Sequence, residues 1–217
     1  MSSQTVAHES RGRPRAAVLA SRPLSHWRTI DLVTAALIAV SMGVVFWAWN
    51  LAYLVPAGLM KGFAAPFAGL LNGPWLLAGV VGALVIRRPG AALFAEMLAA
   101  TVSALLGTEW GWLVLVSGLL QGVGVEIAVA LTAYRRFGVV IAMIGGALAG
   151  LVSGVYEVFY YYSGLDPQWQ VLYTASFMVS GALVAGLGGW ALTRALARTG
   201  ALGSLPPGQE AARGSAV

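Results

Sequence analysis

Four glutamates lie among the apolar stretches of this 217-residue chain, whereas nearly all of its arginines lie at the ends of those stretches. A charged side chain within a bilayer costs roughly 2.5–3.5 kcal/mol on insertion scales, so such groups usually face a partner, a cation or a proton path. The four residues are Glu96, Glu109, Glu126 and Glu157. Their positions predict a membrane protein with a polar, anionic pocket.

The four glutamates differ in their expected depth. At a rise of about 1.5 Å per residue, Glu96 and Glu126 lie about 9 Å and about 12 Å from the inner ends of their helices, where the two carboxyls could meet. They either face a ligand or tie helices together as protonated or hydrogen-bonded carboxyls. Glu157 is expected near the outer end of its helix, and Glu109 in a solvated turn.

The composition favours the membrane interpretation and disfavours an enzyme. The chain is 59% hydrophobic and 10% charged, with a mean hydropathy of +0.79, unlike a soluble domain. It has no cysteine, and its two histidines, His8 and His26, lie outside the apolar stretches, so no zinc site or histidine-based triad can form in the membrane. No phosphate-binding loop is present, so ATP hydrolysis would need another chain. We expect no cofactor, no metal and no nucleic acid; the arginines suit anionic lipid head groups.

Six apolar segments are long enough, or nearly so, for helices that cross a bilayer. Arginines mark every second boundary between them, which places both termini in the cytoplasm by the positive-inside rule. The sequence thus predicts an all-α membrane protein with a six-helix substrate-binding domain over residues 26–198, and disordered cytoplasmic tails at 1–25 and 199–217. The expected helices are 30–49, 74–86, 91–106, 111–133, 138–162 and 171–193.

Residues 50–73 do not continue a regular apolar pattern. They contain Pro56 and Pro66, and the following Asn72-Gly73-Pro74 interrupts any helix, because proline can begin a helix but not continue one. We expect a partly helical outer loop that dips into the membrane between the first two helices. A kinked, tilted helix is the alternative.

Small residues recur at four-residue spacing in three helices and would let helix backbones approach closely. In the fifth and sixth helices, internal packing is the favoured role. In the first helix, the stripe formed by Ala35, Ala39 and Gly43 either packs internally or receives another subunit.

Aromatic residues gather at the predicted outer ends. A ring face attracts an organic cation, by perhaps 0.5–2 kcal/mol per contact, and a nearby carboxylate would neutralise it. Some of these rings are therefore expected to line the pocket, although an interfacial belt is the ordinary role of each one. The outer group comprises Trp47, Trp49, Tyr53, Trp110, Trp112, Phe159, Tyr160, Tyr161, Tyr162, Trp169 and Tyr173.

One ordered set of short motifs resembles a known family. Residues 88–93 (RPGAAL) are followed by Glu96, Ala99-Ala100 and Leu105-Leu106-Gly107, and then by QGVGVE at 121–126. This pattern resembles the substrate-binding S components of energy-coupling-factor (ECF) vitamin transporters, of the YkoE type associated with thiamine and its hydroxymethylpyrimidine precursor. The motifs span about residues 87–130, and the six-helix arrangement extends the resemblance to about 28–198.

The resemblance implies a binding subunit in the cell membrane that works with a transmembrane T component and two ATP-binding-cassette ATPases. It implies that Ala35 and Ala39, with Gly43 on the same stripe, face the T component, and it carries Glu96, Gln121 and Glu126 over as pocket residues. Thiamine carries a cationic thiazolium and an amino group that can donate to a carboxylate. On these physical grounds, Tyr156, Glu157 and Tyr160 are added as candidate pocket residues. Trp110, Trp47 and Asn50, at predicted outer ends, complete the candidates.

Two other functions stay open from the sequence. A proton-coupled secondary transporter of a small organic cation would use Glu96 and Glu126 as a proton relay. A structural membrane protein would bind no small molecule.

Overall fold

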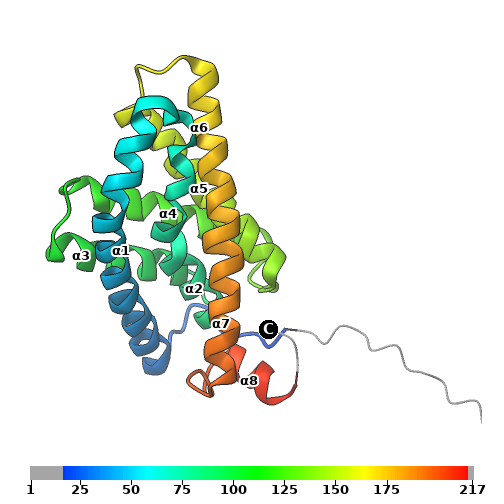
Figure 1. Ribbon diagram of the computed structural model, residues 1–217. Coiled ribbons are helices and arrows are strands. Elements are labelled where there is room, and N and C mark those ends of the chain that lie inside the picture. Colours follow the sequence, from blue (N-terminus) through cyan, green and yellow to red (C-terminus); the bar gives the residue numbers. More distant parts are fainter. Residues whose placement is uncertain (1–16, 215–217) are drawn as a thin grey trace, which may run out of the picture.

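The computed structural model describes residues 17–214, without the side chains of residues 61–63, and in that part of the chain the regular elements are all helical (Figure 1). The all-α prediction is confirmed. The elements are α1 (Thr29–Phe63), η1 (Ala65–Leu71), η2 (Gly73–Leu76), α2 (Leu77–Ile86), α3 (Ala91–Leu106), α4 (Leu113–Leu131), α5 (Val139–Tyr161), α6 (Pro167–Ser180), η3 (Gly181–Leu187), α7 (Gly188–Arg198) and α8 (Pro206–Ala212).

Four helical segments in the described part are long and apolar enough to cross a membrane. A fifth arises if η1 and the segment Gly73–Ile86, which meet at a bend of 44°, count as one span, while α3 is a shorter apolar helix. The elements α6, η3 and α7 form one rod that runs the height of the molecule (Figure 1). The four segments are Thr29–Met60, Leu113–Ala130, Val139–Tyr161 and Pro167–Arg198.

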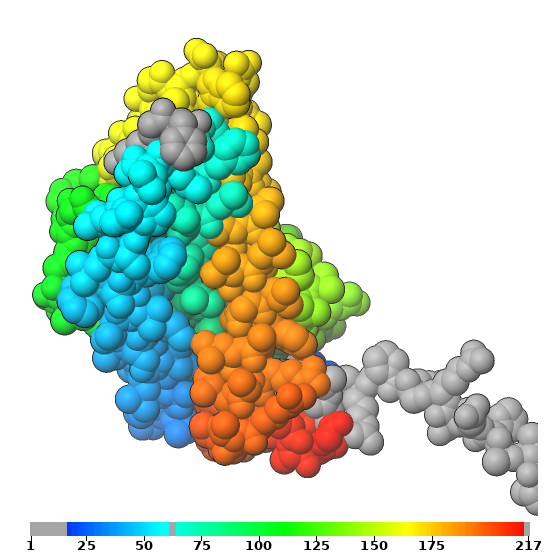
Figure 2. Space-filling model, viewed as in Figure 1, coloured from blue at the N-terminus to red at the C-terminus, as the bar shows by residue number. Residues whose placement is uncertain are grey.

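Helix α2 lies at the centre of the bundle. All of its residues from 78 to 86 are buried, and only a narrow strip of it is visible between α1 and α7 (Figure 2). It packs against α1, α3 and α7. Because α2 is central, the residues that directly precede it, 72–76, also lie in the interior.

The small residues of α5 pack against those of the rod formed by α6, η3 and α7. A Cβ atom on Gly146 would lie 2.1 Å from the carbonyl oxygen of Gly181, a distance that no real side chain could keep. The contact falls where the rod changes from α-helix to the π-helix η3. The expected internal role of these two stripes is therefore observed.

Helix α1 is longer than the sequence indicated. Residues 50–63, predicted to belong to a partly helical outer loop, continue α1 through Pro56. The loop prediction is wrong for this part of the segment, and the helical alternative describes it. Apart from Pro56, Gly58 and Gly62, the segment consists of residues that a helix tolerates, and one missing hydrogen bond bends a long apolar helix rather than ending it. Only 64–76 leave the α-helical path, as the two 3-10 turns η1 and η2.

The small-residue stripe of α1 faces inward. Ala35 and Ala39 have no exposed surface, Gly43 is also buried, and a Cβ on Gly43 would lie 2.5 Å from the Cβ of Val102 in α3. The prediction that these residues dock a partner is therefore wrong. They let α1 approach α2 and α3, and the exposed side of α1 carries larger residues such as Leu37.

We expect Ala39→Leu to destabilise the isolated protein. Three extra carbons have no room at this position, and overpacking of a core costs about 1–3 kcal/mol. A thermal melt in detergent should show a lower Tm, whereas Ala48→Leu, at an exposed position of the same helix, should melt like the wild type. Equal melting temperatures for both variants would contradict the inward placement of the stripe.

Two buried ion pairs lie at the end of the bundle that carries α8. Arg87 and Arg88 are each only 1% exposed. Arg87 makes two hydrogen bonds to Glu210 of α8, at 2.6 and 2.9 Å, and Arg88 donates to Asp31 of α1 at 2.6 Å. A buried charge is tolerated when it is paired in this way.

The same arginines fix the first described residues. Arg87 donates to the carbonyl oxygen of Val18 at 2.7 Å, the Val18 N–H donates to Glu210 at 2.6 Å, and Arg88 donates to the carbonyl oxygen of Ser21 at 3.2 Å. The prediction of disordered tails is therefore wrong for residues 17–25 and 199–214, because their polar groups satisfy buried arginines. The rest of both predicted tails, 1–16 and 215–217, lies outside the described residues.

Glu210→Ala should lower stability strongly. The change leaves the Arg87 guanidinium buried without its carboxylate, and breaking one partner of a buried pair costs about 3–5 kcal/mol. The neighbouring change Gln209→Ala is the control, because within residues 17–214 the Gln209 side chain makes only an exposed hydrogen bond, to the carbonyl oxygen of Ser204. If the Glu210→Ala and Gln209→Ala proteins had the same Tm, the Arg87–Glu210 ion pair would contribute nothing to stability.

Candidate functional site

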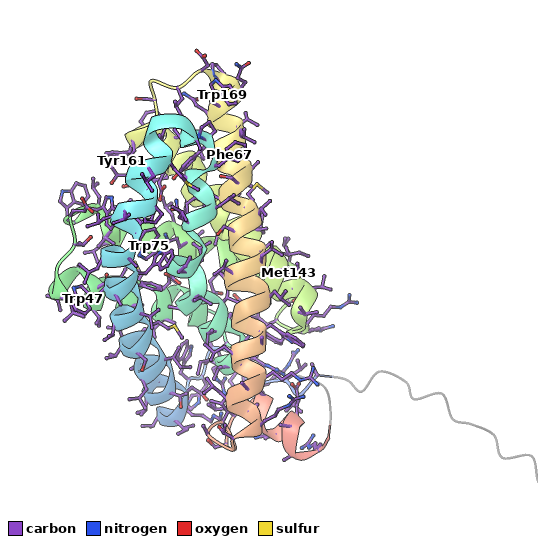
Figure 3. The ribbon with its side chains drawn as sticks, in the orientation of Figure 1. Trp47, Phe67, Trp75, Met143, Tyr161 and Trp169 are labelled. Carbon is purple, nitrogen blue, oxygen red and sulfur yellow. The ribbon has the colours of Figure 1, made fainter. Side chains whose placement is uncertain are left out.

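A cavity of about 310 Å³ opens between α1, the 72–75 segment, α4 and the end of α5. Pockets of this size suit one small organic molecule. Figure 3 shows Trp75 near mid-height and Tyr161 nearer the end at which α6 begins, opposite α8. The lining residues are Phe46, Tyr53, Leu54, Ala57, Gly58, Asn72, Trp75, Ala100, Glu109, Trp110, Leu113, Val114, Ser117, Gln121, Tyr156, Glu157, Tyr161 and Tyr162.

Three aromatic rings from different parts of the chain form one wall of the cavity. The ring centroids of Tyr53 and Trp75 lie 4.8 Å apart, those of Trp75 and Trp110 5.5 Å, and those of Tyr53 and Trp110 5.9 Å. All three contacts are edge-to-face, the arrangement that ring quadrupoles prefer. The wall can thus present ring faces to a flat or cationic ligand.

Asn50 and Ser103 hold this wall from behind. The Trp75 indole N–H donates to Asn50 Oδ1 at 2.8 Å, and Asn50 Nδ2 donates to Ser103 Oγ at 3.1 Å. Asn50, a candidate ligand-binding residue, is buried and is not among the lining residues. The structure gives it a role in orienting Trp75.

An acidic and amide wall faces the cavity from α5 and the 72–75 segment. Glu157 Oε2 accepts hydrogen bonds from Asn72 Nδ2 at 3.0 Å and from the Tyr173 hydroxyl. Asn72 Nδ2 also contacts the Tyr173 hydroxyl oxygen at 3.0 Å. The buried Asn72 Oδ1 accepts no hydrogen bond from the described residues. The Glu157 carboxylate and the Asn72 amide therefore stand together beside the cavity.

Gln121 forms the deep end of the cavity along α4. Its amide is fully satisfied in one orientation, with its oxygen accepting from Ser117 Oγ at 2.9 Å and its nitrogen donating to Glu96 Oε1 and to the Trp75 carbonyl oxygen, both at 3.2 Å. The side chain therefore links the cavity surface to the buried Glu96. Its position among the lining residues agrees with its selection as a candidate.

Glu96 and Glu126 lie off the cavity and tie helices together. Glu96, fully buried, accepts from the Gly79 N–H at 2.5 Å and so links α3 to α2. Glu126 of α4 accepts from the Ala92 N–H at the start of α3, at 2.8 Å. The two carboxyls use different partners and do not form the pair that the sequence suggested. For both, the geometry agrees with the helix-tying alternative.

Tyr134 gives Glu126 its second hydrogen bond, from the phenol hydroxyl at 2.7 Å. Tyr134 follows the end of α4. Burial, together with the neighbouring Glu126 carboxylate, raises the pKa of the Tyr134 phenol above its ordinary value, so the hydroxyl keeps its proton and remains a donor.

The other candidates divide by position. Tyr156, Glu157 and Trp110 line the cavity, whereas Trp47 and Tyr160 do not; the Tyr160 side chain is 53% exposed and contacts the ring of Tyr156. Glu109, expected only in a solvated turn, is a lining residue. It adds a second carboxylate to the cavity.

Sequence reasoning missed the central contribution of residues 72–75. Asn72 and Trp75 flank the Gly73-Pro74 break, and the break itself was the available signal, because irregular backbone within a membrane protein must be covered by protein or line a cavity. Among the described residues, no group of three or more His, Cys, Asp or Glu side chains is placed to hold a metal ion.

Comparisons with known proteins agree on one family. Residues 30–152 match the family described as ABC-type cobalt transport system, permease component. The chain is 31% identical over 189 residues to YkoE of Bacillus subtilis (strain 168), named an HMP/thiamine permease protein, covering 86% of this chain and 93% of that one. A crystal structure of an S component of an ECF transporter matches with a TM-score of 0.81 and 31% identity, over 87% of this chain and 94% of that one.

The chain belongs to the YkoE-type S components of ECF transporters. The resemblance read from residues 87–130 is confirmed. This S component is a multi-pass protein of the plasma membrane, and its relatives are transporter components rather than enzymes.

The hydrogen bonds of Glu96 predict a structural phenotype for its removal. Glu96→Ala should lower the Tm, because the Gly79 N–H and the Gln121 amide lose their acceptor, and an unsatisfied buried polar group costs about 1–3 kcal/mol. Glu109→Ala, which removes a carboxylate outside the helices, should leave the Tm nearly unchanged. A Glu96→Ala protein as stable as the Glu109→Ala protein would refute the helix-tying role.

Proposed function

We propose that this S component binds thiamine or its hydroxymethylpyrimidine precursor in the 310 Å³ cavity and delivers it across the membrane with a T component and two ATP-binding-cassette ATPases. The observation that carries the proposal is the placement of the Tyr53, Trp75 and Trp110 wall beside the Glu157 carboxylate within one cavity. The name of the Bacillus subtilis relative supports the same ligands.

The chemistry of the cavity matches the two halves of thiamine. A positively charged thiazolium gains from aromatic faces and from nearby carboxylates, because the ring quadrupole and the negative charge act in the same direction. The exocyclic amine of the pyrimidine can donate to the Glu157 carboxylate, which lines the cavity. The precursor lacks the thiazolium and would use only the second set of contacts.

The proposed membrane arrangement keeps six spans. These are α1, the bent segment from η1 to α2, α3, α4, α5 and the rod from α6 to α7, with the end that carries α8 in the cytoplasm. The arginine-rich boundaries support this orientation. Because Ala35, Ala39 and Gly43 are buried, the T component would dock on other residues.

A proton-coupled secondary transporter finds less support. The relay proposed for it needs Glu96 and Glu126 to exchange a proton, yet each carboxyl is held by its own hydrogen bonds to other groups. The geometry therefore favours a binding subunit.

Detergent-purified protein should bind thiamine or hydroxymethylpyrimidine, with heat in calorimetry and quenching of tryptophan fluorescence by the ligand beside Trp75 and Trp110. Glu157→Gln should weaken thiamine binding about 10- to 100-fold, which corresponds to the loss of a charge-assisted hydrogen bond of about 1.5–3 kcal/mol.

Glu126→Gln is the matched control, because it also removes a carboxylate from an apolar helix but lies off the cavity. The glutamine oxygen can still accept from the Ala92 N–H, and its amide N–H can donate to the Tyr134 hydroxyl oxygen, which would then turn its own proton away. It should bind like the wild type. If neither compound gives heat or quenching at micromolar protein, the proposal fails; if Glu126→Gln and Glu157→Gln weaken binding equally, the cavity is the wrong site.

A further inference from the structure

The segment that brings Asn72 and Trp75 to the cavity is held by side chains of its neighbours. Residues 65–76 form two 3-10 turns rather than an α-helix. Such short turns satisfy fewer of their own peptide groups than an α-helix does. The remaining groups need partners, because the hydrocarbon of a bilayer offers none and irregular backbone there must be buried in protein or line a cavity.

Ser180, the last residue of α6, supplies two of these partners. Its hydroxyl accepts a hydrogen bond from the Gly73 N–H at 3.0 Å and donates to the carbonyl oxygen of Leu70 at 2.6 Å. Ser180 is buried. The two bonds bracket Asn72 in the sequence, so one hydroxyl fixes the backbone on both sides of the side chain that reaches Glu157.

The contact depends on the absence of a side chain at residue 73. A Cβ atom there would lie 2.5 Å from Ser180 Oγ and 2.7 Å from the Ser180 carbonyl oxygen. Gly73 thus lets the loop backbone lie directly on α6, within reach of the hydroxyl.

Two other side chains also form hydrogen bonds to this segment, at positions different from those that Ser180 holds. Ser176 Oγ donates to the carbonyl oxygen of Pro66 at 3.1 Å, and on the α1 side the Trp49 indole N–H donates to the carbonyl oxygen of Leu71 at 3.0 Å. Tyr173 of α6 contacts the Asn72 side chain, whereas Ser180 holds the backbone on either side of Asn72. Ser180 does not line the cavity.

We propose that Ser180 is a positioning residue for the ligand site: it acts through the backbone of residues 70–73 to hold Asn72 and Trp75 against the cavity, without touching the ligand. The identity of the ligand in this inference rests on the function proposed above. Removing the hydroxyl takes the Ser180 partner from the buried Gly73 N–H and from the Leu70 carbonyl oxygen, and the segment gains freedom to move.

The first test is hydrogen–deuterium exchange on the ligand-free protein. In the wild type, the Gly73 amide should exchange slowly, like a helix amide. In Ser180→Ala, peptides covering 66–76 should exchange at least tenfold faster. The matched control is Ser153→Ala, a buried serine of α5 whose hydroxyl has no partner among the described residues; its 66–76 peptides should exchange like the wild type.

The second test is a double-mutant cycle for binding, with thiamine and hydroxymethylpyrimidine as the titrants. Ser180→Ala should weaken binding about 5- to 20-fold, Ser153→Ala should not, and Ser180→Ala combined with Asn72→Ala should bind little worse than Asn72→Ala alone. Such non-additivity is the signature of residues that act through one another. A merely structural role would lower the Tm and leave the two affinity losses multiplicative.

Three results would overturn the proposal: wild-type exchange and affinity in Ser180→Ala, affinity losses that multiply in the cycle, or fast exchange of the Gly73 amide in the wild type. The last needs no variant, so the test stands even if Ser180→Ala does not fold. If the wild type binds neither compound, the proposed function fails, while the exchange experiment still decides whether Ser180 holds the segment.

Discussion

A polypeptide that leaves the regular helix inside a bilayer has no water with which to satisfy its peptide groups. Residues 65–76 do this here, between a helix of 35 residues and the buried α2. Their free N–H and carbonyl groups are matched by Ser176 and Ser180 on one side and by Trp49 on the other. Because this one segment supplies both Asn72 and Trp75, the aromatic wall and the acidic wall of the cavity depend on how its backbone is held.

The need to pair buried polar groups also distinguishes two kinds of polar residue in the interior: those that link helices and those that line the cavity. Glu96 and Glu126 accept hydrogen bonds from backbone N–H groups of α2 and α3, respectively, and these bonds link neighbouring helices. Glu157 has both of its protein hydrogen bonds on Oε2, and Asn72 keeps a free Oδ1. In a membrane interior an unused acceptor is costly. Asn72 is thus a polar residue at the cavity whose hydrogen-bonding capacity the described residues leave partly unused.

The sequence predicted most helices closely, because apolar length and arginine boundaries decide them: 91–106 agrees with α3, and 138–162 with α5. It placed Tyr156, Glu157, Trp110 and Gln121 among the candidates that do line the cavity. It could not tell that Ala35, Ala39 and Gly43 face α2 and α3, since a small-residue stripe permits close approach without naming the partner. Nor could it show that Glu210, in a polar segment, neutralises Arg87, because that pair joins positions 123 residues apart.

The cavity ends well before the arginine-rich end of the bundle. Along α4 its lining stops at Gln121, which is held by Ser117, Glu96 and the Trp75 backbone. Beyond it lie the buried α2 and the Arg87–Glu210 pair, with the ring of Phe137 5.0 Å from the Arg87 guanidinium. A ligand moving toward α8 would have to break these contacts, each of which leaves a buried polar or charged group unpaired. The internal energetics thus oppose passage through the chain at rest, which fits a subunit that captures its ligand and relies on energised partners, as in the proposed function, for delivery.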